Sequence, residues 1–182
     1  MRDGQARRRG WMPGVSILGR LAGAGAMAVL CIGTVPAATS VATFGVRTNL
    51  QGNCRATVNA LAFPAYTPGA GARTANTTIG VRCTRNTAFT VSLDAGTTAG
   101  ASFAQRLMAL GAGRLQYNLY TTAARTTVFG DGSASTAVRT GTGAGLATVR
   151  NVRVFGSLPD SAANQAAAPG AYSDTITVTV SY

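Results

Sequence analysis

The feature that most constrains the fold is an alternating segment at the end of the sequence. From residue 176 onward, apolar and hydroxylated residues alternate, and most of them are β-branched. This pattern is typical of a β-strand with one buried face. Its apolar row consists of Ile176, Val178, Val180 and Tyr182. Because no later segment covers this strand, we expect either that another polypeptide completes its sheet or that the sheet closes into a barrel in a lipid bilayer.

The first 42 residues have the order of a secretory signal. Five arginines precede or border a thirteen-residue apolar run, 21–33, and small residues follow as far as Ala42. The run is shorter than the roughly 20 apolar residues that a membrane-spanning helix needs. We therefore expect residues 1–42 to be a signal peptide, cleaved after Ala37 or Ala42. The mature chain is then exported, without stable membrane insertion once the signal is removed.

The composition argues against an enzyme. The sequence has no His, Lys or Glu, so hydrolytic triads, Schiff bases and most metal centres lack their residue types. Asp94 and Asp131 could be imagined as a glycosidase pair. Aspartates beside glycines are usually turn formers, however, and we expect them to be so here. The sequence therefore predicts no catalytic residues, no cofactor and no metal site.

The charge of the mature chain is strongly positive but scattered. After residue 42 there are 11 arginines and four aspartates, which gives a net charge of +7. The arginines are Arg47, Arg55, Arg73, Arg82, Arg85, Arg106, Arg114, Arg125, Arg139, Arg150 and Arg153. They lack the interleaved aromatic residues of a single-strand-binding platform. We expect them on solvated outward faces of strands, and we expect no nucleic-acid partner.

Two cysteines, Cys54 and Cys83, remain after residue 42. In an oxidising compartment an isolated pair in a small domain usually forms a disulfide. A metal site would need more ligands than two thiols, and the sequence offers neither His nor Glu. We therefore expect a Cys54–Cys83 disulfide.

Short apolar or alternating segments recur along the mature chain and indicate an all-β sandwich or small barrel. Strands are expected at 43–50, 54–59, 77–83, 88–94, 107–108, 115–120, 127–129, within 146–158, and at 176–182. Segments 77–83 and 88–94 are expected to form a hairpin. The glycine-rich segment 140–145 is expected to be a flexible loop, and 159–169 a loop or one turn of helix.

Several of these segments together resemble the spore coat protein U domain family, which includes subunits of archaic chaperone–usher pili. The motifs are Cys54, Leu61-Ala-Phe63-x-x-Tyr66, Ile79-Gly-Val-Arg-Cys83, Phe89-Thr-Val-Ser-Leu-Asp94-x-Gly96, Arg106-x-Met108, Leu115-Gln-Tyr-Asn-Leu-Tyr120, Phe129-Gly-Asp-Gly132, Val154-Phe-Gly156 and the segment from Gly170 to Tyr182. The resemblance covers essentially the whole mature chain and keeps the motif order. Phe129 and Phe155 stand where the family often has Trp and Tyr.

The resemblance implies an incomplete immunoglobulin-like β-sandwich that lacks its last strand. Residues 1–42 would be the signal, 43–52 an N-terminal donor-strand arm, and 53–182 the sandwich domain. A periplasmic chaperone would lend a strand to the open groove, and an outer-membrane usher would exchange it for the arm of the next subunit. The donor residues would be Phe44, Val46, Thr48 and Leu50. The acceptor groove would be built with help from Ile176, Val178, Val180 and Tyr182.

The function implied is a structural subunit of a surface pilus or coat polymer, built from identical or related subunits, with a role in adhesion and biofilm formation. An eight-stranded outer-membrane barrel is a weaker alternative, because most strands here are shorter than the roughly 9–11 residues that span a bilayer. A secreted carbohydrate-binding sandwich is a third, although no Trp remains after residue 42 to form an aromatic platform.

Overall fold

The computed structural model describes residues 38–182, so most of the expected signal peptide lies outside the described residues. The chain divides after Val46, and residues 47–182 form one compact unit. Residues 38–53 form neither helix nor strand, and the side chains of Phe44, Val46 and Leu50 are 87%, 82% and 90% exposed. The strand expected at 43–50 is therefore not formed within a single chain, since a strand requires a partner edge for its backbone groups.

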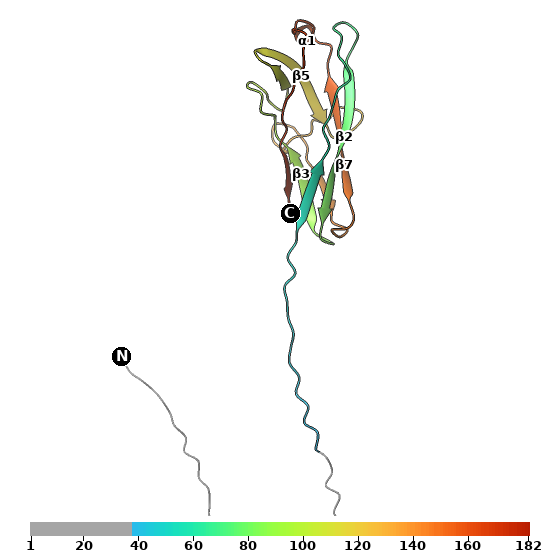
Figure 1. The fold of residues 1–182 in the computed structure, drawn as a ribbon, viewed down its shortest axis with the longest axis vertical. Coiled ribbons are helices and arrows are strands. Elements are labelled where there is room, and N and C mark those ends of the chain that lie inside the picture. The colour runs from blue at the N-terminus through green and yellow to red at the C-terminus, as the bar shows by residue number, and fades with distance from the viewer. Residues whose placement is uncertain (1–37) are drawn as a thin grey trace, which may run out of the picture. The chain divides into compact units, whose positions relative to one another are not determined.

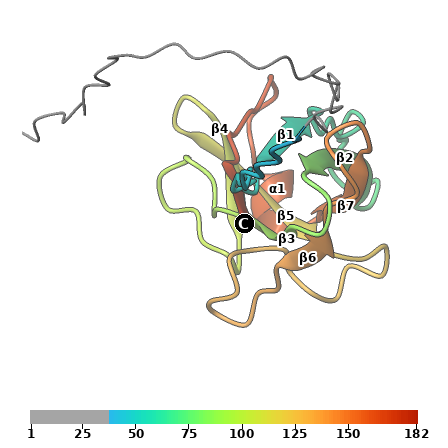
Figure 2. The same ribbon diagram turned by 90° about the horizontal axis from the view of Figure 1, so that it is seen from below.

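The unit that begins at residue 47 is a sandwich of two antiparallel sheets (Figures 1 and 2). The larger sheet has the order β1 (Cys54–Val58), β2 (Arg73–Cys83), β7 (Arg150–Leu158), β5 (Gly113–Tyr120) and β4 (Arg106–Leu110). The smaller sheet has the order β6 (Arg139–Thr142), β3 (Ala88–Leu93) and β8 (Val178–Ser181). One helical turn, α1 (Ala162–Gln165), precedes the terminal segment. The all-β sandwich that the sequence predicts is confirmed.

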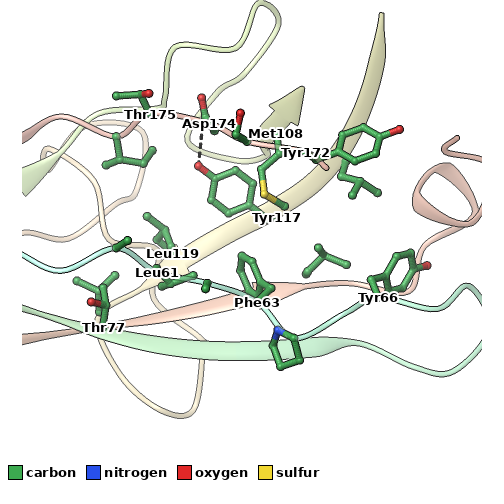
Figure 3. A pocket seen from close by; sticks show the side chains of 18 of the residues that line it. Leu61, Phe63, Tyr66, Thr77, Met108, Tyr117, Leu119, Tyr172, Asp174 and Thr175 are labelled. Carbon is green, nitrogen blue, oxygen red and sulfur yellow. Dashed lines mark hydrogen bonds between the residues drawn. The ribbon is translucent and has the colours of Figure 1, made fainter. Parts of the chain in front are cut away.

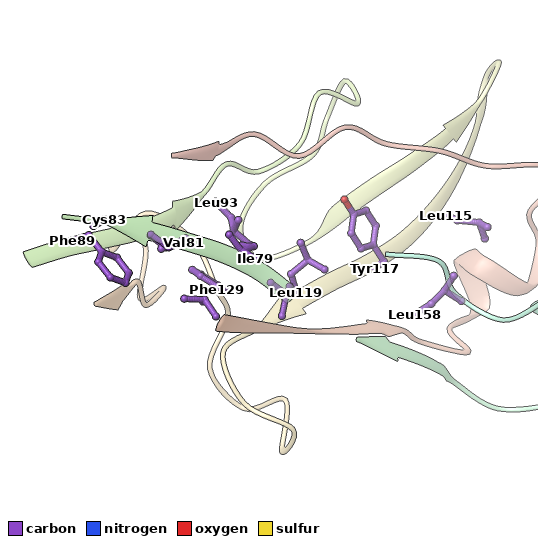
Figure 4. Close-up of a cluster of buried hydrophobic side chains, with 13 residues drawn as sticks. Ile79, Val81, Cys83, Phe89, Leu93, Leu115, Tyr117, Leu119, Phe129 and Leu158 are labelled. Carbon is purple, nitrogen blue, oxygen red and sulfur yellow. The ribbon is translucent and has the colours of Figure 1, made fainter. Parts of the chain in front are cut away.

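Alternating side chains of both sheets fill the space between them (Figure 4). The fully buried members are Ile79, Val81 and Cys83 from β2, Phe89, Val91 and Leu93 from β3, Leu115, Tyr117 and Leu119 from β5, Val152, Val154 and Leu158 from β7, and Phe129. The expected disulfide joins Cys54 to Cys83, which are directly opposite each other in the β1–β2 register. The first strand is thus tied to the core, while the arm before it is not.

The expected hairpin of 77–83 and 88–94 is wrong. The chain does reverse there, with Asn86 in the left-handed region at φ 62°. However, β2 pairs with β1 and β7, whereas β3 pairs with β6 and β8. Both strands bury an apolar row in the same core, so the turn passes the chain from one sheet to the facing sheet instead of extending one sheet.

The glycine-rich segment 140–145 is not simply a flexible loop, because its beginning belongs to β6 and pairs with β3. At Gly141 an added Cβ would lie 2.5 Å from the ring of Phe89. The glycine is therefore required by a close approach to a core side chain. The strand expected within 146–158 is β7, and the expected helical turn is α1.

Arg106 contradicts the expectation that the arginines are solvated, because it is completely buried. Its guanidinium donates to the backbone oxygens of Asp94 and Phe129 and to Oδ1 of Asn118. Burial lowers the pKa of Arg106 from its ordinary value. The arginine thus joins three separate segments at one end of the core.

Candidate functional site

An open apolar groove of about 740 Å³ lies between two chain segments of the sandwich (Figure 3). One wall is residues 58–68, which continue from β1 and are called the first rim here. The other wall is residues 167–178, which lead into β8 and are called the second rim. The floor consists of core side chains, chiefly Ile79, Leu93, Leu115, Tyr117, Leu119, Val154 and Leu158. Part of the hydrophobic core is therefore uncovered between the two rims.

The first rim presents Leu61, Phe63 and Tyr66 as half-buried side chains. Leu61 and Phe63 lie close against β7 because residue 156 is glycine: an added Cβ would meet Phe63 at 2.9 Å and Leu61 at 3.1 Å. The ring of Phe63 also packs edge-on against Tyr117, with centroids 6.1 Å apart. These contacts fix the apolar row of the first rim against the floor.

The backbone of the first rim lacks strand partners. Within the described part of the chain, residues 60–66 make no backbone-to-backbone hydrogen bond. The oxygen of Ala65 accepts from the Arg73 side chain, and Pro64 has no N–H group. The remaining donors and acceptors are available to a further strand, as at any sheet edge.

The second rim alternates from residue 171 onward. From there its half-buried residues are Tyr172, Asp174, Ile176 and Val178, and those between them are exposed; the alternation continues to Val180 in β8. A bridge between Ala109 and Ser173 holds it to β4, and hydrogen bonds between Asp94 and Thr177 hold it to β3. Among the described residues, 174–176 make no backbone-to-backbone hydrogen bond. The second rim thus also has a stretch of unpaired backbone, residues 174–176.

Asp174 places a polar group in the otherwise apolar row of the second rim. Its Oδ2 accepts from the Tyr117 hydroxyl at 2.6 Å, and its Oδ1 accepts from the backbone and hydroxyl groups of Thr97 and Thr98 at 3.1–3.3 Å. Burial alone would raise the pKa of Asp174, but these hydrogen bonds hold it below its ordinary value. Burial and the Asp174 carboxylate together raise the pKa of Tyr117. The pair is therefore a carboxylate and a neutral phenol.

Asp160 ties the first rim to the loop before α1. Its carboxylate accepts from the Tyr66 hydroxyl at 2.5 Å and from the backbone N–H groups of Gly69 and Gly71. The hydrogen bond from Tyr66, followed by those from the glycines, lowers the pKa of Asp160 to about 2. Burial and the hydrogen bond to Asp160 raise the pKa of Tyr66 to about 12. This latch fixes the Tyr66 end of the groove.

The residues that the sequence points to are only partly brought together. Ile176 and Val178 line the groove, whereas Val180 packs on the core beyond it. Tyr182 is 62% exposed and borders a separate shallow hollow beside Phe89. Sequence reasoning missed Asp174, because the alternating row was counted only from residue 176. Extending the row back by two residues would have placed a carboxylate at a half-buried position.

A family model described as the Spore Coat Protein U domain matches residues 40–179. The chain belongs to the Spore Coat Protein U domain family. Proteins of this family are structural and not enzymatic, which agrees with the missing catalytic residue types. A comparison with curated proteins found no match. In the described part of this Spore Coat Protein U chain, no helix is long and apolar enough to cross a bilayer.

Nine chains of solved structures resemble this Spore Coat Protein U chain. One belongs to the CsuC–CsuE chaperone–tip adhesion subunit pre-assembly complex of the archaic chaperone–usher Csu pili of Acinetobacter baumannii. The identity is 23% and the TM-score 0.52, over 72% of this chain and 40% of that chain. The present chain therefore spans about 40% of the length of that relative, and the likeness concerns the fold.

Proposed function

We propose that the protein is a structural subunit of a surface polymer assembled by a chaperone and an usher, and that its groove receives the N-terminal arm of another copy. The observation that carries this proposal is the groove itself. Two facing rims with unpaired backbone groups border an exposed strip of core. Membership of the Spore Coat Protein U domain family and the likeness to a Csu pilus complex support the same function.

The groove has the chemistry that strand addition requires. An inserted strand could hydrogen-bond to both rims, and every second side chain would cover the apolar floor. The arm supplies Phe44, Val46 and Leu50 on one face, all exposed in the single chain. Burying each such side chain stabilises a complex by about 1.5–3 kcal/mol before the cost of ordering the arm. The three together therefore contribute roughly 5–9 kcal/mol of gross stabilisation.

An uncovered groove of this kind would also pair with unrelated strands. A periplasmic chaperone that lends a strand prevents this, and an outer-membrane usher then lets the next subunit replace the chaperone strand. Export by the signal at 1–42 places the chain in the compartment where both steps occur. A polymer anchored at the cell surface suits a role in adhesion and biofilm formation.

The test is deletion of residues 43–50 from the mature chain. Polymers visible by electron microscopy should disappear, while circular dichroism of the deleted protein still shows a β-sandwich. Adding a peptide of residues 40–52 should raise the melting temperature of the deleted protein. The control is the same peptide with Val46→Asp, which should have no effect because the groove floor is apolar. Normal polymers from the deleted protein would refute the proposal.

A further inference from the structure

The inward rows of the arm and of the second rim match in a specific way. On the second rim, the inward residues lining the groove are Tyr172, Asp174, Ile176 and Val178. On the arm, the alternating row is Phe44, Val46, Thr48 and Leu50. Each row has four positions, and one position in each row carries a polar side chain that is not aromatic. This residue is Asp174 on the second rim and Thr48 on the arm.

We propose that the arm of a second copy lies antiparallel to the second rim in a single register, with Thr48 opposite Asp174. This inference rests on the proposed function and adds the register in which the arm pairs with the second rim. The register places Val46 opposite Ile176 and Leu50 opposite Tyr172. Phe44 then lies opposite Val178, so every inward position of both rows has a partner.

Other registers lose this match. Sliding the arm by two residues puts either Val46 or Leu50 against the Asp174 carboxylate. Sliding it by one residue turns the arm over and points Arg47 at the apolar floor. A parallel arm with Thr48 at the same place brings Gly52 to Val178 and leaves that end of the floor uncovered.

The carboxylate has an acceptor position for the threonine hydroxyl. A carboxylate has about four acceptor sites, two on each oxygen. Oδ1 of Asp174 is shared among donors of Thr97 and Thr98, whereas Oδ2 accepts only the Tyr117 hydroxyl among the described residues. Gly96 packs against one side of Oδ2, and in the proposed register the Thr48 hydroxyl donates to the acceptor site of Oδ2 that neither Gly96 nor Tyr117 occupies. A valine or leucine opposite Asp174 would shield the carboxylate from water without donating a hydrogen bond to it.

The chain's own arm cannot occupy this register. With Leu50 opposite Tyr172, the end of the arm lies at the Tyr66 end of the groove, since Tyr66 and Tyr172 lie at the same end in Figure 3. Cys54 begins β1, which precedes the first rim at the opposite end. Four residue steps from Leu50 to Cys54 reach about 14 Å at most, but the eight steps from Val58 to Tyr66 alone span roughly twice that when extended. An arm that occupies the groove in this register must therefore come from a second copy.

The register can be tested by cross-linking in the full mature chain. Antiparallel pairing with Thr48 at Asp174 places Arg47 opposite Thr175, and both are exposed. The double variant Arg47→Cys with Thr175→Cys should form a ladder of intermolecular disulfides on non-reducing gels. The matched controls pair Arg47→Cys with Ser173→Cys or with Thr177→Cys, also exposed positions. We expect roughly tenfold less ladder from each control, because cysteines displaced by two residues are too far apart to bridge.

The outcomes separate the register from the function on which it rests. A ladder that is strongest with Ser173→Cys or Thr177→Cys would overturn the register, while showing that arms do enter grooves. Polymers that form with no ladder in any of the three variants would overturn the register, and the deletion of residues 43–50 then decides on the proposed function separately. The strongest ladder with Thr175→Cys would support both.

The polar match has its own test, a swap that conserves composition. The double variant Val46→Thr with Thr48→Val should form polymer about tenfold more slowly, because a valine then faces Asp174 and a threonine faces Ile176. Thr48→Ser keeps the hydroxyl and should polymerise nearly as fast as the natural chain. Equal rates for the swap and the natural chain would show that Asp174 does not select the register.

Discussion

Replacing Arg106 by methionine should destabilise the sandwich strongly. The guanidinium is buried and donates at 3.1 and 2.6 Å to the Asp94 oxygen, at 2.7 Å to Asn118 Oδ1 and at 2.7 Å to the Phe129 oxygen. Methionine fills most of the same space, but it leaves the Asp94 and Phe129 oxygens without their donor, whereas Asn118 Oδ1 keeps the hydrogen bond from the Leu119 N–H.

The expected loss is about 3–5 kcal/mol. Each acceptor left without a partner costs about 1–3 kcal/mol, and the sum is partly offset because a charge no longer has to be buried. Apolar replacement of a whole buried ionic group is often harmless, but here two of the partners are backbone carbonyls that remain in place. For a domain of this size the melting temperature should fall by roughly 10–15 °C.

Urea unfolding followed by circular dichroism, with the disulfide intact, measures this loss. The matched control is Arg114→Met, since Arg114 donates to the oxygens of Gly111 and Gly113 at a more exposed turn. The control should change the free energy of unfolding by about 0.5 kcal/mol or less. A loss below about 1 kcal/mol for Arg106→Met would refute the idea that the guanidinium holds these segments together.

Two further predictions concern the surroundings of Asp174 and Asp160, beside the groove. Gly96→Ala should cost well over 1 kcal/mol, because its φ is +95° and the new Cβ would meet a carboxylate oxygen of Asp174. Gly69→Ala, at φ +80° with open space around it, should cost only about 1 kcal/mol in the same thermal unfolding assay. Asp160→Asn should lower stability at pH 6 but not at pH 2. The folded-state pKa of Asp160 is about 2 against an ordinary 3.8, so its contribution is present above pH 3.8 and is lost as the pH falls towards 2. An undiminished difference at pH 2, measured by urea unfolding, would argue against the Tyr66–Asp160 latch.

The strands of the sandwich are easier to predict from the sequence than the sheet to which each strand belongs. Alternation alone places the inward rows of β2, β3 and β5, because in each strand the buried apolar side chains occupy every second position. The disulfide follows from two cysteines in a chain that the sequence predicts to be exported. Which sheet each strand joins does not follow, since a turn at Asn86 serves a hairpin and a crossover between sheets equally well.

Polar residues in the interior were the hardest to predict. Arg106 was grouped with the solvated arginines because charge is a good guide to exposure on average. Its burial depends on acceptors that come from distant positions, the Asp94 and Phe129 oxygens and Asn118. Asp174 was given no role, because its carboxylate is charged and it precedes the alternating row. Only the assembled fold brings Tyr117, Thr97 and Thr98 to its carboxylate.

The edges of the two sheets explain why association should occur at the groove. A sheet edge invites pairing when its backbone is unpaired and its face is apolar. β4 is covered along part of its outer side by the bridge from Ala109 to Ser173. β6 has four residues, three of them exposed, and offers little apolar surface.

The edges beside β1 and β8 differ from these two, because they border the same strip of uncovered core from opposite sides. One added strand would satisfy both edges at once, whereas a strand added at β4 or β6 would satisfy only one. The alternating terminal strand and the first rim therefore have unpaired edges for the same reason, since one added strand would pair with both. Covering both requires a single segment from outside the domain, and its inward residues must suit Asp174 as well as the apolar floor.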